Sequence, residues 1–196
     1  MQKNRCVPDV SEQRELWKQA APEFDPGQLV FLDESGVNTD LTRAYGRSIG
    51  KQRVVDRVPL ATPKRRSIVG AIRLDGTIRY RSWQESINGQ RFLEYLKTTL
   101  APALRPGDIV VMDNLSCHKV EGVREIILKA KALPLYLPPY SPDFNPIEKL
   151  WSKLKALLRK WKVRKSERLK AAIKKAVMAV TSADCNGWFS CAGYCQ

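Results

Sequence analysis

The chain has 196 residues, 43% of them hydrophobic, which is enough to bury one good core and to form one substantial domain. Its 34 Lys and Arg residues outnumber 20 acidic residues, giving a net charge of +14 and an isoelectric point near 9.8, as is typical of proteins that bind polyanions. No apolar run approaches the roughly 18 residues of a membrane span, and the N-terminus lacks the apolar core of a signal peptide. We therefore expect a cytoplasmic protein with no membrane partner.

Two segments hold the positive charge. Residues 149–175 contain twelve basic residues and one acid, and residues 43–66 contain eight basic residues and one acid. The rest of the chain is net negative. Either segment alone could be a solvated face, but this concentration of charge favours contact with nucleic acid.

The five cysteines predict no disulfide framework. Their odd number prevents complete pairing within the chain, and the last three have neither a CxxC spacing nor a nearby histidine, so a zinc site among those three is not expected. We interpret all five as reduced thiols: Cys6, Cys117, Cys185, Cys191 and Cys195.

The apolar pattern of the first half predicts mainly strands. In chain order, the predicted elements are a helix at 11–20, strands at 29–32, 53–60, 67–74 and 77–83, and a helix at 92–100. Asp75-Gly76 is a strong signal for a tight hairpin turn between the last two strands.

The second half alternates strands and helices. The predicted elements are a buried strand at 109–112, a helix at about 120–131, a strand at 133–137, helices at about 146–161 and 166–180, and a short aromatic tail that contains Trp188 and Tyr194. This order predicts an α/β fold with a mixed sheet flanked by helices, which is the ribonuclease H-like arrangement.

Two of the buried strands lead into an aspartate. Asp33 follows the strand 29–32, and Asp113 follows the strand 109–112. If these strands are parallel neighbours, both acids lie at the carboxyl edge of one sheet, where α/β sheets bind their ligands. The alternative is that aspartate follows a strand because turns favour it.

A third acid stands at the start of a helix. In the segment PPYSPDFNPIEKLW, Asn145 is the expected N-cap, Pro146 the first helical residue and Glu148 a residue of the first turn. Asn145 and Glu148 also fit a capping box that only satisfies helix N–H groups. Three converging carboxylates would repel one another unless a divalent cation neutralised them, and Mg²⁺ and Mn²⁺ prefer such oxygen ligands.

Two motifs of the chain are MDNLSCHK and LPPYSPDFNPIEKLW, with 34 residues between Asp113 and Glu148. They resemble the motifs of mariner-type DDE transposases, especially those of the bacterial insertion-sequence branch. The resemblance covers about residues 29–194. It implies that Asp33, Asp113 and Glu148 are catalytic and hold two Mg²⁺ or Mn²⁺ ions. The implied reaction is metal-dependent cleavage of DNA strands, followed by strand transfer during transposition.

Three residues near these acids are also candidates for the site. Glu34 adjoins Asp33, but alternation along a strand sends the two side chains to opposite faces, so we select Asp33. Asn114 either orients Asp113 or only forms the turn. His118, the only histidine, either contacts a phosphate near the metals or is a polar residue at a helix start, and the motif match places it near the site.

Two surfaces are predicted to bind DNA. On the helix at 146–161, Glu148 shares a face with Ser152, Lys155 and Arg159, while an apolar stripe of Ile147, Leu150, Trp151, Leu154 and Leu158 faces the core. The second surface is the loop 42–53, where a solvated loop is the alternative; its candidate DNA contacts are Arg43, Tyr45, Arg47, Lys51 and Arg53.

Residues 1–28 are predicted to be a helical lead-in, and residues 29–196 the catalytic domain. Full-length relatives carry N-terminal helix-turn-helix domains, for which 28 residues are too few, so we expect a separate or frameshift-fused DNA-binding part. Family analogy implies a homodimer and a bacterial, nucleoid-associated protein. The alternatives are a structure-directed nuclease on the same fold, or an inactive nucleic-acid-binding remnant, against which the intact acid triad argues.

Overall fold

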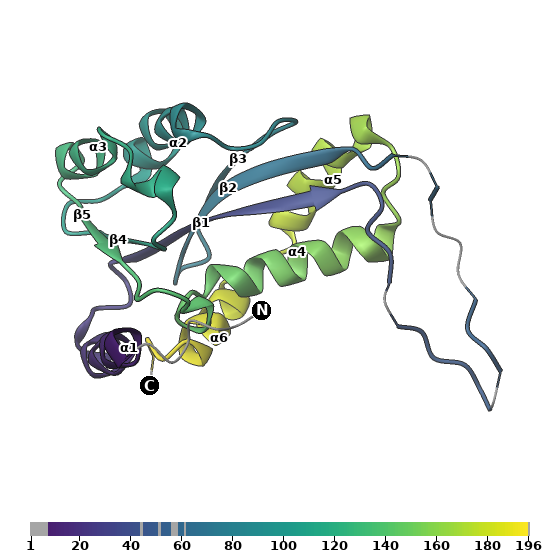
Figure 1. Cartoon of the computed structure of the whole chain (residues 1–196), viewed down its shortest axis with the longest axis horizontal. Coiled ribbons are helices and arrows are strands. Elements are labelled where there is room, and N and C mark those ends of the chain that lie inside the picture. The colour runs from purple at the N-terminus through teal and green to yellow at the C-terminus, as the bar shows by residue number, and fades with distance from the viewer. Residues whose placement is uncertain (1–7, 44, 51, 56–58, 61, 196) are drawn as a thin grey trace.

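The computed structural model describes residues 8–43, 45–50, 52–55, 59–60 and 62–195. Its centre is a five-stranded sheet in the order β3-β2-β1-β4-β5 (Figure 1). The strands are β1 (Leu29–Asn38), β2 (Arg65–Arg73), β3 (Ile78–Trp83), β4 (Ile109–Met112) and β5 (Leu133–Tyr136). The pairs β1–β2 and β2–β3 are antiparallel, whereas β1–β4 and β4–β5 are parallel. The expected mixed sheet, with the two aspartate strands as parallel neighbours, is confirmed.

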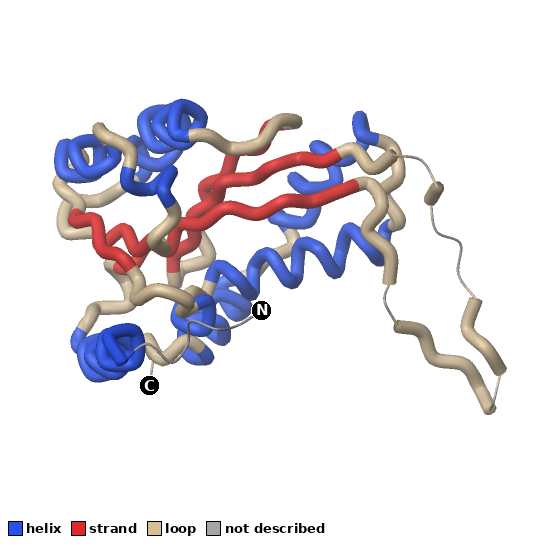
Figure 2. Tube along the Cα trace, viewed as in Figure 1, coloured by secondary structure: helices blue, strands red, loops and turns tan. Residues whose placement is uncertain are grey.

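Helices cover both faces of this sheet (Figure 2). One face carries α1 (Pro8–Ala20), α4 (Ile147–Trp161), α5 (Ser166–Met178) and α6 (Ser182–Cys191), and the other carries α2 (Gly89–Tyr95) and α3 (Val123–Lys129). Side chains alternate along β1, so Phe31 joins the core under α4, while Val30 and Leu32 join the core under α2 and α3. Among the described helices, none has the length and apolar character needed to cross a bilayer.

Two predicted strands differ from the structure. β1 does not end before Asp33 but continues to Asn38, because β2 pairs with it along this whole length, from Val30 opposite Arg73 to Asn38 opposite Arg65. The strand expected at 53–60 is absent from the residues described there, 52–55 and 59–60. These residues belong to the long connection from β1 to β2.

The helices also required corrections. The helix predicted at 92–100 is α2 followed by a π-helical turn at Leu96–Leu100, and the one at 120–131 is the shorter α3, which a 3-10 turn at Ser116–Lys119 precedes. The predicted aromatic tail is helix α6. Thr181 and Asp184 form a capping box at its start, and Phe189 fixes it to the core.

The described parts of the connection between β1 and β2, residues 39–64, extend away from the body of the molecule (Figure 1). Tyr45 and Ile49 in this loop are more than nine-tenths exposed. The root of the loop is held by Arg164, whose guanidinium donates hydrogen bonds to the carbonyls of Thr39 and Leu41 at 3.1 and 2.8 Å. Lys64, from the basic segment 43–66, donates its N–H to the Thr39 hydroxyl at 3.0 Å, so Thr39 links that segment to Arg164 of the segment 149–175.

Candidate active site

Asp33 and Asp113 lie at the same level on neighbouring strands. Phe31 is opposite Val111 in the parallel pairing of β1 and β4, so two further residues along each chain bring Asp33 beside Asp113. Phe31 and Val111 both pack on the α4 side, and alternation directs Asp33 to that side as well. Asp33 is inside β1, whereas Asp113 directly follows β4, so the end of β4 defines this edge of the site.

Glu148 is contributed by the first turn of α4. Asn145 has an extended backbone, and its Oδ1 accepts a hydrogen bond from the Ile147 N–H at 3.4 Å, while Pro146 already has helical dihedral angles. The helix begins at Ile147 with Pro146 as its N-cap, one residue later than expected, and Asn145 ends the preceding 3-10 turn. The Glu148 N–H bonds the Asn145 carbonyl at 3.2 Å, which places the Glu148 side chain on the first turn.

The three carboxylates that the sequence singled out line one cavity. The remaining wall is formed by the segments that follow β4 and β5, including Asn114 and Leu137. Asp33 is 6% exposed, so it lies at the buried end of this cavity.

The electrostatics of the three acids are coupled. Burial raises the pKa of Asp33 to about 7, and the charges of Glu148 and Asp113 add to the shift. Burial likewise raises the pKa of Glu148, with a further contribution from Asp113. For Asp113, burial opposes ionisation, but hydrogen bonds from His118 and the Leu115 N–H outweigh it and lower the pKa. A divalent cation would relieve this repulsion, and an all-carboxylate donor set suits Mg²⁺ or Mn²⁺.

Trp151 is a site residue that the sequence reasoning placed only in the core stripe. It lies one turn after Glu148, and its indole Nε1–H donates a hydrogen bond to Asp33 Oδ2 at 3.0 Å. Gly70 is opposite Asp33 on β2, and a Cβ atom there would lie 2.8 Å from the Trp151 ring. The glycine therefore lets the ring lie against the sheet. The i, i+3 spacing of Glu148 and Trp151, which places both side chains on neighbouring positions of the helix surface, was the signal in the sequence that could have placed Trp151 near the site.

His118 lies against the catalytic strand end. Its side chain is fully buried, and its Nδ1 is 2.7 Å from Asp113 Oδ1. Burial acts to lower the pKa of His118, but hydrogen bonding to Asp113, together with Cys117 and Glu34, raises it to about 12. His118 thus lies near the site, as expected, and it belongs to a 3-10 turn.

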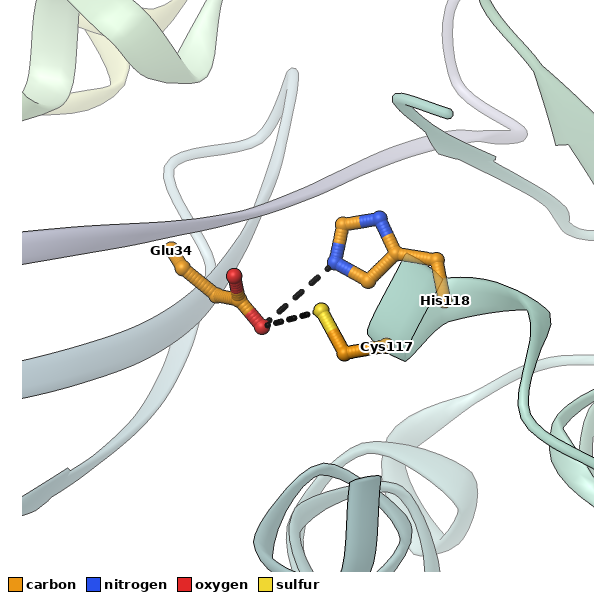
Figure 3. Close-up of side chains that lie close together, drawn as sticks. All are labelled: Glu34, Cys117 and His118. Atoms are coloured by element: carbon orange, nitrogen blue, oxygen red, sulfur yellow. Dashed lines mark hydrogen bonds and ion pairs between the residues drawn. The ribbon is translucent and has the colours of Figure 1, made fainter. Parts of the chain in front are cut away.

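Asn114 and Glu34, the other two neighbours of the aspartates, make contacts elsewhere. Asn114 donates its amide hydrogen to the carbonyl of Leu137, so it ties the end of β4 to the end of β5. Glu34 faces the opposite side of the sheet from Asp33, where it lies near Cys117 and His118 (Figure 3). Glu34 is not among the residues that line the cavity, whereas Asp33 is.

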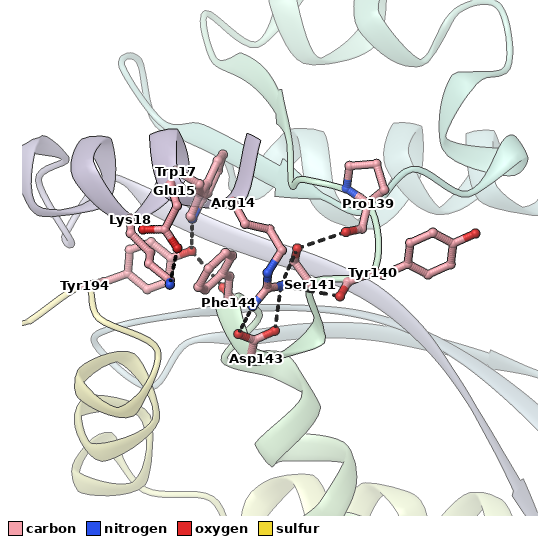
Figure 4. Close-up of polar contacts among 10 residues, drawn as sticks. All are labelled: Arg14, Glu15, Trp17, Lys18, Pro139, Tyr140, Ser141, Asp143, Phe144 and Tyr194. Atoms are coloured by element: carbon pink, nitrogen blue, oxygen red, sulfur yellow. Dashed lines mark hydrogen bonds and ion pairs between the residues drawn. The ribbon is translucent and has the colours of Figure 1, made fainter. Parts of the chain in front are cut away.

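The loop that introduces Glu148 is anchored to α1 (Figure 4). The Arg14 guanidinium bonds both carboxylate oxygens of Asp143, at 3.0 and 2.7 Å, and the hydroxyl of Ser141 at 2.8 Å, and it stacks over the Phe144 ring. Tyr194 donates to the Phe144 carbonyl at 2.7 Å and accepts from the Trp17 indole. Segments from both ends of the chain therefore fix this loop.

The predicted faces of α4 are confirmed for the core stripe, because Ile147, Leu150, Trp151, Leu154 and Leu158 are all buried. Lys155 and Arg159 lie partly exposed on the face that begins with Glu148. The charge of Lys155 acts to lower the pKa of Glu148, so it is felt at the site. Arg43, Tyr45, Arg47 and Arg53 are exposed in the loop 39–64, and Lys51 lies outside the described residues.

Residues 28–170, most of the chain, match the family model described as DDE superfamily endonuclease. Among curated protein sequences, none matches significantly. The chain is similar to the solved Mos1 transposase paired-end complex with left transposon end, with 17% identity and a TM-score of 0.76 over 94% of this chain and 58% of that one. The Mos1 mariner paired end complex with Mn gives 18% identity and a TM-score of 0.68 over 93% and 60% of the two chains.

The catalytic domain of Mos1 mariner transposase, solved by itself, aligns with 94% of this chain and 90% of its own length, at 15% identity and a TM-score of 0.64. The chain thus spans a little over half of the transposase in the paired-end complex but nearly all of the separate catalytic domain. The ribonuclease H-like fold expected from the sequence is confirmed. Together with the family match, this identifies the chain as a member of the DDE superfamily of endonucleases.

Proposed function

We propose that this chain is the catalytic domain of a mariner-type transposase, which cleaves DNA strands and joins them to target DNA with two Mg²⁺ or Mn²⁺ ions. The observation that carries this proposal is the meeting of Asp33, Asp113 and Glu148, from three separate elements, in one cavity. Divalent ions bound there would supply an activated water or 3′-hydroxyl nucleophile and stabilise the leaving oxygen. Mos1 transposase, similar in fold, has been solved with Mn and with a transposon end.

The residues of the chain have distinct roles in this proposal. Asp33 and Asp113 hold the shared pair of ions, and Glu148 completes the site. Trp151 and His118 each orient one of the aspartates through a hydrogen bond, which fixes the carboxylate for its ligand role. Asn114 keeps the strand ends together.

DNA would follow the basic face of α4. Lys155 lies two turns from Glu148 and Arg159 one turn further, so a phosphate backbone leaving the site passes both before it reaches the root of the loop 39–64. The loop then offers a second contact surface, with Tyr45 available to stack on a base; its basic candidates are Arg43, Arg47, Lys51 and Arg53.

The biological setting is also a proposal. We place a helix-turn-helix part for end recognition on a separate or frameshift-fused segment and expect a homodimer that joins two ends; in fold, the chain matches 58% of the transposase chain in the Mos1 paired-end complex. The setting would be an insertion sequence in a bacterial nucleoid. Residues 29–196 form the catalytic domain in this scheme, and the lead-in 1–28 contributes α1, which anchors the Glu148 loop.

The test is incubation of labelled DNA with Mn²⁺ and three proteins: the unmodified chain, Asp113→Asn and Glu148→Gln. We expect both substitutions to reduce metal-dependent cleavage at least about a hundredfold, because each removes a metal ligand. Joined products on a target DNA identify a transposase, whereas cleavage without joining identifies a structure-directed nuclease. Equal DNA binding by all three proteins with no metal-dependent cleavage would identify a binding remnant and overturn the proposal.

A further inference from the structure

A second group of potential metal ligands lies behind the catalytic acids. It consists of Glu34, Cys117 and His118, whose ligand atoms all lie within 4.8 Å of one another (Figure 3). Glu34 comes from β1, and the other two come from the 3-10 turn after β4. Because Glu34 is on the opposite side of β1 from Asp33, this group is separate from the cavity of the three carboxylates.

The distances in this group fit tetrahedral coordination. Zinc bonds of about 2.0–2.2 Å to nitrogen and oxygen and about 2.3 Å to sulfur place neighbouring ligand atoms about 3.3–3.6 Å apart at tetrahedral angles. Glu34 Oε1 is 3.6 Å from His118 Nε2 and 3.3 Å from Cys117 Sγ. The two separations from Glu34 are those that one zinc ion would require, and the Cys117 and His118 ligand atoms lie within 4.8 Å of each other.

His118 is arranged as a metal ligand. Its side chain is fully buried, and its Nε2 points at the Glu34 carboxylate, with 3.6 Å between Nε2 and Oε1, which is longer than a hydrogen bond. Its Nδ1 is held by the Asp113 carboxylate at 2.7 Å. In metal sites, such a carboxylate takes the Nδ1–H and leaves the Nε2 lone pair for the ion. A buried polar atom with only a long contact to a carboxylate is poorly satisfied, and a metal ion between the two groups would satisfy it.

We propose that Glu34, Cys117 and His118 bind one Zn²⁺ ion, with a fourth coordination position open to solvent. The thiolate and imidazole donors select zinc over the Mg²⁺ or Mn²⁺ that suit the carboxylate cavity. Glu34 and Cys117 are partly exposed, which provides access for the ion. Through the His118–Asp113 hydrogen bond, the zinc site would hold the orientation of a catalytic carboxylate.

The competing reading is a protonated His118 that bridges Asp113 and Glu34 with no metal. The two readings differ in the role of Cys117, because only the metal site uses its sulfur as a ligand. The test therefore follows the thiolate. It needs neither DNA nor catalysis, so its outcome is independent of the proposed function.

Co²⁺ alone is titrated into the full chain and into Cys117→Ser, Glu34→Gln and Cys191→Ser, and absorption is recorded. Cys191 is an exposed free cysteine and serves as the matched control. We expect the unmodified chain and Cys191→Ser to show a thiolate-to-Co²⁺ charge-transfer band and tetrahedral visible bands, which Zn²⁺ removes by displacement. Cys117→Ser abolishes the charge-transfer band, and Glu34→Gln weakens Co²⁺ affinity at least about tenfold.

Circular dichroism melting checks that each variant is folded, and the two partly exposed positions provide two independent variants. The absence of a thiolate band in the unmodified chain overturns the proposal. So does a band that persists in Cys117→Ser or is lost in Cys191→Ser.

Discussion

Asp33 is the acid whose environment depends most on its neighbours. It is buried, two other carboxylates repel its charge, and among the described side chains the Trp151 indole is the one that donates a hydrogen bond to it. The indole is fixed by its attachment to α4, and it fits against the sheet because Gly70 has no side chain that would collide with the ring. In the proposed metal site, Trp151 would therefore be a positioning residue as well as a core residue.

Replacement of Trp151 by Phe tests this role. The ring still fills the core, but the hydrogen bond to Asp33 Oδ2 is lost, so we expect Mn²⁺ affinity to fall about tenfold or more. Isothermal titration of the metal measures the change. Trp161→Phe, at the far end of the same helix, is the control and should bind Mn²⁺ as the unmodified chain does. If Trp151→Phe loses thermal stability but keeps its Mn²⁺ affinity, the residue is structural only.

Helix α4 connects the catalytic cavity to the basic surface. Its first turn provides Glu148, its buried stripe fixes it to the sheet, and Lys155 and Arg159 continue the Glu148 face toward the loop 39–64. The sequence predicted both faces because a 15-residue amphipathic helix carries its periodicity locally.

Replacement of Lys155 and Arg159 by Ala should weaken DNA binding and flatten the salt dependence of the binding constant by up to about two units, one for each lost phosphate contact. Fluorescence anisotropy over a series of salt concentrations measures the slope. Arg124→Ala with Lys129→Ala provides a charge-matched control, because these exposed residues lie on α3 at the opposite face of the sheet. An unchanged slope in the α4 variant contradicts the proposed DNA path.

The predicted helices and strands were wrong where strand pairing between distant parts of the sequence set an element's length, or where an element was too short to show a clear hydrophobic periodicity. The apolar run of β1 ends at Leu32, and the remainder of the strand is polar apart from Gly36 and the buried Val37. This part is held by pairing with β2, a contact that local periodicity does not report. Helix α6 was overlooked because Gly187 interrupts a short pattern in which only Cys185 and Phe189 are buried. Its capping signal, Thr181 with Asp184, was the available clue.

At the scale of the whole molecule, the N-terminal helix supports the active site. Arg14 on α1 is linked to Asp143, Ser141 and Phe144 in the loop before Glu148. Helix α1, Tyr194 and the loop before Glu148 thus form one packed unit.

Arg14→Ala removes the two-pronged contact with Asp143, which is partly exposed, so we expect a loss of about 1 kcal/mol in unfolding free energy. Mn²⁺-dependent cleavage should fall as well, since the loop no longer holds Glu148 firmly. Lys18→Ala on the same helix, whose charge pairs with Glu15 one turn away, is the control. Equal cleavage rates in the two variants would separate α1 from catalysis.

The sequence predicted the three acids because each has a local signature: a strand that leads into Asp33 or Asp113, and a proline-rich helix start for Glu148. It did not predict the Glu34–Cys117–His118 group. Glu34 and Cys117 are 83 positions apart and meet only through sheet packing, and His118 was considered only in relation to the catalytic site. Pairs of this kind depend on tertiary contacts that no local pattern reports.

The most direct test of the metal site compares thermal unfolding of the unmodified chain with Asp33→Asn, Asp113→Asn and Glu148→Gln, each with and without Mn²⁺. Binding at about a hundred times the dissociation constant should raise the unmodified chain's melting temperature by about 5–10 °C. Without metal, Asp33→Asn should be at least as stable as the unmodified chain, because repulsion among the acids is relieved. On addition of Mn²⁺, the melting temperature of all three variants should rise much less than that of the unmodified chain. An equal Mn²⁺ shift in all four proteins would contradict a metal site built from these three carboxylates.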